Sequence, residues 1–180
     1  VVRKLANDHD IEVARPVIRS SPVLTDTDLV GIAMTGAQDH MHAIAARDKL
    51  SSAVTDVLID RGNQRVVHRV SANHGAEVSH WGFDRLLEKA RADVNLQEVL
   101  VERPDLSQTT VEKLLPLISE TLAIKLVERG FDVGKMLTPE MMQLARDRFA
   151  EALRDRKADI RGVAALVELV AKGELTLDQA

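Results

Sequence analysis

Cysteine is absent from this chain of 180 residues. Its absence excludes disulfide bonds, thiolate nucleophiles and cysteine zinc sites, and it fits a reducing compartment such as the cytoplasm. Tyrosine is also absent, and the four aromatic residues are Trp81, Phe83, Phe131 and Phe149. So few aromatic rings cannot fill the interior of a chain of this length, so we expect a core of aliphatic side chains.

Long apolar runs and catalytic signatures are lacking too. No apolar stretch approaches the roughly 18 residues that a spanning helix needs, and the N-terminus lacks the order of a secretory signal. The net charge of −4 argues against a general affinity for nucleic-acid backbones. We find no glycine-rich phosphate loop, no GxSxG serine and no HExxH motif. The sequence therefore favours a cytoplasmic protein with neither catalytic activity nor a cofactor.

What the sequence does contain is a helical pattern. Helix-forming residues dominate, and the two-residue alternation of strands is nearly absent. Gly36, Gly62, Gly130 and Gly173 each follow an apolar-periodic run, where a helix is expected to stop. These features predict an all-α fold.

A hydroxyl residue suited to N-capping recurs down the chain, at Thr25, Ser51, Ser79 and Ser107, with spacings of 26, 28 and 28 residues. The residues four, seven and eight positions after each cap share one helix face. They are Leu29, Ile32, Ala33, Thr55, Leu58, Ile59, Phe83, Leu86, Leu87, Val111, Leu114 and Leu115. Eleven of these twelve are apolar, where the 45% hydrophobic composition predicts between five and six, so we infer a structural repeat.

A shorter helix is expected before each cap, around Val17-Ile18, Ala43-Ile44 and Val99-Leu100. Before Ser79, extra residues around NHGAE displace the corresponding Val67 and Val70. Pro22 and Pro104 end two of these short helices. A pair of a short and a longer helix cannot bury its apolar stripe alone, so neighbouring pairs must stack. We therefore predict a right-handed, HEAT-like α-solenoid of about four helix pairs over residues 1–119.

Residues 120–180 are predicted to form a separate C-terminal helical unit. Pro116 should kink or split the run before it, and Thr138-Pro139-Glu140 should start a helix. The run IRGVAALVELVAK is expected to be a buried helix. Because the chain opens on Val1 and stops at LTLDQA, we expect it to be a fragment of a longer protein.

Two stretches carry a family resemblance: LANDHDIEVARPVIRSSPVLTDTDLVGIA and HAIAARDKLSSAVTDVLIDRGNQRVVHRV. They resemble a bacterial domain of unknown function, number twenty-three thirty-six, found mainly in alphaproteobacteria. The likeness covers most of the chain and is closest over residues 5–115. It implies an all-helical, HEAT-like repeat protein and carries over no catalytic residues.

All six histidines lie between positions 9 and 80, and imidazoles are common metal ligands. His40, His42 and His68 are the candidate ligands, and His42 and His68 each stand six residues after a helix-ending glycine. A zinc site needs three or four converging ligands, and no spacing here supplies them. We favour histidines that are solvated or hydrogen-bonded, and we assign no metal.

The candidate binding residues are Arg15, Arg19, Arg47, Arg65, Arg69 and Trp81. A row of arginines on the short helices could bind phosphates or acidic segments, although the interleaved acids also fit a salt-bridged surface. An exposed Trp81 would be a binding hot spot, although packing over its turn is the preferred interpretation. Met136, Met141 and Met142 could line an adaptable groove or belong to the core.

These observations predict a scaffold that binds another protein or another segment of its own full-length chain. The first alternative is a phosphate- or nucleic-acid-binding repeat that uses the arginines, although nucleic acid is disfavoured because bases usually stack on aromatic rings. The second is a metal-dependent enzyme that uses the histidines. No membrane association is expected, and the oligomeric state is left open.

Overall fold

The structure is a computed structural model, and it describes residues 1–133. This part of the chain is entirely helical, without a strand, as the sequence predicts. The elements are α1 (Val2–Ala6), α2 (Ile11–Ser20), α3 (Asp26–Thr35), α4 (Gln38–Ala45), α5 (Ser52–Arg61), α6 (Gln64–Ser71), α7 (His80–Ala90), α8 (Val94–Val101), α9 (Gln108–Leu114), the 3₁₀ turn η1 (Leu115–Leu117) and α10 (Glu120–Glu128).

The chain divides into two compact units, Val1–Pro104 and Asp105–Ala180. The limits predicted from the sequence, 1–119 and 120–180, place the division elsewhere and stay a prediction. The helix predicted from Thr138, the apolar run near residues 160–172, the stop at Gly173 and the three C-terminal methionines lie outside the described residues.

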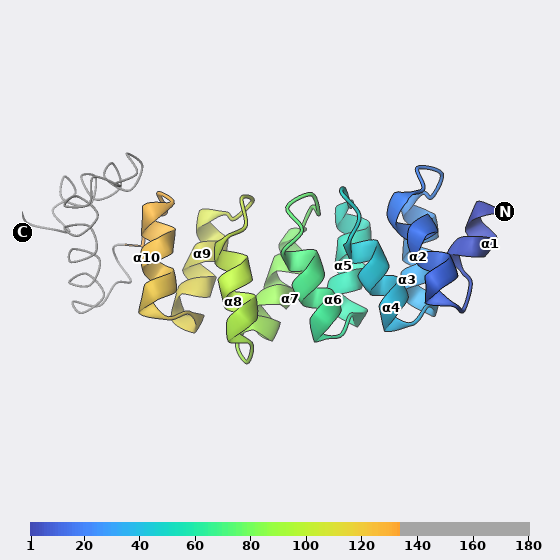
Figure 1. Cartoon of the computed structure of the whole chain (residues 1–180). Coiled ribbons are helices and arrows are strands. Elements are labelled where there is room, and N and C mark those ends of the chain that lie inside the picture. The colour runs from blue at the N-terminus through green and yellow to red at the C-terminus, as the bar shows by residue number, and fades with distance from the viewer. Residues whose placement is uncertain (134–180) are drawn as a thin grey trace, which may run out of the picture. The chain divides into compact units, whose positions relative to one another are not determined.

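The first unit contains two series of helices (Figure 1). In one series α2 packs against α4, α4 against α6 and α6 against α8. In the other, α3 packs against α5 and α5 against α7. Within each series, a helix thus contacts the next helix but one along the chain, because short turns return the chain to the same side after every pair. The core between the two series is mainly aliphatic.

The four predicted caps are confirmed as the N-caps of α3, α5, α7 and α9. Three of the hydroxyls accept a first-turn amide: Thr25 from Asp28 at 3.3 Å, Ser79 from Gly82 at 2.9 Å, and Ser107 from Thr110 at 3.1 Å. The hydroxyl of Ser51 makes no such bond. The pattern therefore places the starts of these four helices but not every capping bond.

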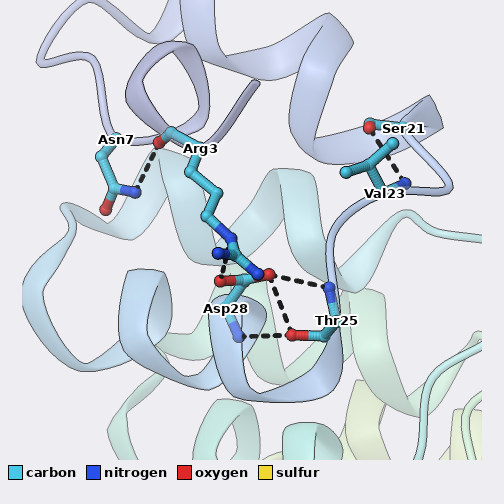
Figure 2. A network of polar contacts seen from close by, with 6 residues as sticks. All are labelled: Arg3, Asn7, Ser21, Val23, Thr25 and Asp28. Carbon is cyan, nitrogen blue, oxygen red and sulfur yellow. Dashed lines mark hydrogen bonds and ion pairs between the residues drawn. The ribbon is translucent and has the colours of Figure 1, made fainter. Parts of the chain in front are cut away.

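Thr25 and Asp28 form a full capping box (Figure 2). The Asp28 carboxylate accepts from the Thr25 amide at 3.0 Å and from its hydroxyl at 2.9 Å, and Arg3 of α1 pairs with it at 2.8 Å. The hydrogen bonds from Thr25, with that ion pair, lower the pKa of Asp28. The box ties the start of α3 to α1.

The predicted inner face is confirmed, because all twelve positions after the caps are buried. Leu58 and Leu114 are 0% exposed, so both contribute fully to aliphatic cores. Thr55, the one polar member, is also buried. The short helices bury Ile18, Ile44 and Leu100 in the same way.

The predicted helix stops are confirmed where the structure describes them. Gly36 and Gly62 are the C-caps of α3 and α5. Gly130 follows α10 with φ +86°, and the amides of Gly130 and Phe131 bond back to Val127 and Leu126 in a Schellman arrangement. Pro116 lies in η1 and separates α9 from α10, because it has no amide hydrogen to continue the helix. The expected kink or split is therefore a split.

Candidate functional site

The carbonyl groups that end α2 are bound by Arg47, which follows α4. Its guanidinium donates to the carbonyl of Ile18 and, at 3.1 Å, to that of Ser21. The last carbonyls of a helix lack partners within the helix and carry partial negative charge, so a cation is stabilising there. Arg47, predicted as a binding residue, is thus engaged in joining α2 to the segment after α4.

The same arrangement recurs at the ends of α4 and α6. Asn73 donates to the carbonyls of Ala45 at 3.1 Å and Arg47 at 2.6 Å. Arg103 donates to the carbonyls of Ser71 at 2.8 Å, Asn73 at 3.3 Å and Ala76 at 2.9 Å. The helices α2, α4 and α6 are therefore each bound at the C-terminal end by a side chain from the region after the next short helix.

Two hollows open beside this series of bonds. The first, of about 600 Å³, is lined by Arg19, Ser20, Pro22, Ala46, Arg47, Asp48 and Lys49. The second, of about 400 Å³, is lined by Ala46, Arg47, Asp48, Arg69, Ala72, Asn73, His74 and Gly75. They share the Ala46–Asp48 segment, and together we call them the basic groove.

The loop that follows α6 forms one wall of the basic groove. Leu50 donates its amide to the carbonyl of Gly75 at 3.0 Å, and Glu77 donates to the carbonyl of Leu50 at 2.9 Å. A Cβ atom on Gly75 would lie 1.8 Å from the carbonyl oxygen of Asp48. Only glycine permits this approach. The loop with the extra residues around NHGAE can therefore pack closely against the segment after α4.

The charges of the basic groove are unevenly distributed. Four basic side chains, Arg19, Arg47, Lys49 and Arg69, face a single acid, Asp48. Arg19, Lys49 and Arg69 are exposed and have no ion-pair or hydrogen-bond partner for their side chains within residues 1–133. These three cations are available to an external anion.

The remaining predicted arginines are paired. Arg15 lies 2.9 Å from Glu12 in α2, and Arg65 of α6 lies 3.2 Å from Asp39 of α4. The structure therefore brings Arg19, Arg47 and Arg69 together in one groove and leaves Arg15 and Arg65 in surface ion pairs. Lys49 was not predicted from the sequence, although it lies only two residues before the Ser51 cap.

Trp81 lies on α7, in the other helix series. Its side chain is 48% exposed, and the guanidinium of Arg85 lies 6.0 Å from the ring centroid. Arg85 also pairs with Glu88 in α7 and with Asp60 of α5. Trp81 is thus accessible but is not part of the basic groove, and its role as a hot spot stays a prediction.

The three candidate metal ligands have separate surroundings. The Nε2 atom of His40 lies 2.7 Å from the carbonyl oxygen of Asp8, and that of His68 lies 2.6 Å from the carboxylate of Asp93. In the described part of the chain, no three side chains of His, Asp or Glu gather closely enough to hold a metal ion.

Burial and charge shift two pKa values near α6. Burial, with the cations Arg65 and Arg69, lowers the pKa of His42. Burial acts to raise the pKa of Asp93, but its hydrogen bonds, led by the one with His68, outweigh that effect and lower it. His42 therefore stays neutral at pH 7 in electropositive surroundings, whereas Asp93 stays ionised at the N-cap of α8.

None of the helices within residues 1–133 is long and apolar enough to cross a membrane.

Within residues 1–133, the fold and the site define an all-helical structure that carries a basic groove. The model of a family described as an uncharacterised protein conserved in bacteria (DUF2336) matches residues 13–179, so the chain belongs to this family. The family expected from the sequence is thereby confirmed. Comparisons with curated proteins and with solved structures give no match.

Proposed function

We propose that this chain is a right-handed, HEAT-like α-solenoid that acts in the cytoplasm as a protein-binding module without catalytic activity. The observation that supports it best is the contact between next-but-one helices from α2 to α8 in the first unit. Such packing is typical of stacked helix pairs, which present extended surfaces to partners.

The use of the polar side chains also supports a scaffold. Thr25, Ser79 and Ser107 bond to amides at helix starts, and Arg47 and Arg103 bond to carbonyls at helix ends. Hydroxyl groups that could serve chemistry are thus engaged in capping helices, and the guanidinium groups in joining them. The absence of cysteine supports the cytoplasm as the compartment.

The decisive experiment is to purify the tagged full-length protein from its own bacterium after mild crosslinking and nuclease treatment. We expect one protein to be recovered near a one-to-one ratio, identified by mass spectrometry and reconstituted from purified components. Recovery of nucleic acid alone, which is lost on nuclease treatment, would support the phosphate-binding alternative. The excess of basic residues in the groove favours that alternative over a metal-dependent enzyme.

A further inference from the structure

We propose that the basic groove binds an extended acidic segment of a protein partner, with Arg19, Lys49 and Arg69 pairing with its carboxylates. This inference rests on the proposed function, because it names the part of the partner that the module recognises.

The position of the basic groove suits an extended chain. Its lining comes from the ends of α2, α4 and α6, which are consecutive members of one helix series. Packed helices lie about 8–10 Å apart, so the span from α2 to α6 is roughly 16–20 Å. An extended segment covers about 3.3 Å per residue, so about six residues would cross both hollows.

The charge of the basic groove selects an acidic occupant. The whole chain has a net charge of −4, yet four basic side chains line these hollows against one acid. Because Arg19, Lys49 and Arg69 are exposed and unpaired within residues 1–133, an incoming carboxylate need not displace a resident one. Guanidinium groups also match carboxylates in geometry.

Arg47 offsets the negative charge of a helix end beside the basic groove. Helix C-termini carry partial negative charge and would repel an anion. The guanidinium of Arg47 bonds to the last carbonyls of α2, and so neutralises that charge between the two hollows. After burial, the cations Arg65, Arg69 and Arg15 lower the pKa of His42 against the opposing effect of Asp39, which indicates a positive potential at His42 on α4.

The lining disfavours nucleic acid as the occupant. Neither hollow is lined by a tryptophan, tyrosine or phenylalanine side chain on which a base could stack. The exposed Trp81 belongs to α7, in the other helix series. The carboxylates of a protein segment are therefore the better match.

The test uses fluorescence anisotropy with a labelled peptide of twelve residues in which glutamate alternates with glycine. The groove variant carries Arg19→Glu, Lys49→Glu and Arg69→Glu. The control variant carries Lys4→Glu, Lys89→Glu and Arg91→Glu, which change the net charge equally and lie outside the groove. Circular dichroism must show the same helicity in all three proteins, as expected for surface substitutions.

We expect the peptide to bind the unchanged protein in a salt-dependent way, because exposed ion pairs are individually weak and are screened by salt. The groove variant should lose at least about tenfold in affinity, and the control variant less than about twofold. Equal losses in both variants, or no binding to the unchanged protein, would overturn the proposal. The proposal would also be overturned if a single-stranded oligonucleotide of twelve nucleotides bound more tightly than the peptide and lost its affinity in the groove variant.

The purification experiment separates this inference from the proposed function. If the groove variant still recovers the protein partner, the protein-binding function stands and the groove proposal is wrong. If the groove variant loses the partner while the control variant retains it, both are supported.

Discussion

The guanidinium of Arg103 donates a hydrogen bond of 2.8 Å to the carbonyl oxygen of Ser71, and both residues are 0% exposed. The same guanidinium bonds to the carbonyls of Asn73 and Ala76 and lies 5.8 Å from the ring centroid of Phe83. One buried cation therefore joins the end of α6 and the loop after it to the residues that follow α8.

Replacing Arg103 with methionine should lower the free energy of unfolding by about 3 kcal/mol, because several buried carbonyls would lose their donor. Urea denaturation followed by circular dichroism measures the loss. Arg103→Lys should cost less, since it keeps the charge but not the three directed bonds. Equal stability of Arg103→Met and the unchanged protein would show that the buried bonds contribute nothing.

The buried faces predict strong effects at Leu58 and Leu114. Each Leu→Ala substitution should cost about 2–5 kcal/mol through lost burial and the cavity left behind. Leu5→Ala is the control, because Leu5 is 38% exposed and should lose far less. Near-neutral results at both buried sites would mean that the described faces do not form the core.

Substitution by alanine should lower the folding stability at Gly82 and raise it at Gly31. A Cβ on Gly82 would lie 2.6 Å from Oδ1 of Asp56, which the Ser79 hydroxyl holds in place at 2.8 Å. Gly82→Ala should therefore cost about 1–3 kcal/mol through overpacking of α5 and α7. A Cβ on Gly31 meets nothing within 4 Å, so Gly31→Ala should stabilise α3 by about 0.5–1 kcal/mol. Thermal unfolding of the two variants compares them, and stabilisation by both would contradict the close approach of α5 and α7.

Thr25 and Ser51 occupy equivalent caps but should differ on substitution. Thr25→Ala should cost about 1 kcal/mol, because it removes the capping bond of α3. Ser51→Ala should be near neutral, since its hydroxyl is buried without a hydrogen-bond partner. The urea midpoints of the two variants measure the stability that each has lost. Equal losses would contradict the difference in capping.

The lowered pKa of His42 makes stability depend on pH. Below its unfolded pKa of about 6.5, the unfolded chain binds a proton that the folded protein takes up only at lower pH. His42 therefore contributes stability above pH 6.5 that is lost as the pH falls toward the folded value. His42→Gln should reduce the fall in urea midpoint between pH 7.5 and pH 5.5, and identical pH profiles would contradict the shift.

Short-range patterns in the sequence determined much of the described fold. The N-caps, the buried positions after them and the helix-ending glycines could be located because each depends on residues within one or two helical turns. The split at Pro116 follows from a missing amide hydrogen. The histidines and arginines could be named as candidates by residue type, but not assigned partners.

Only the tertiary structure decided which of those side chains remain free. Arg47 and Arg69 look alike in sequence, yet the first bonds to carbonyls at the end of α2 and the second stays exposed. Asp39 and Asp93 pair with side chains 26 and 25 residues away, a separation at which the sequence sets no distance. The basic groove likewise draws Arg19, Lys49 and Arg69 from three segments, because stacking of the helices, and not spacing along the chain, brings them side by side.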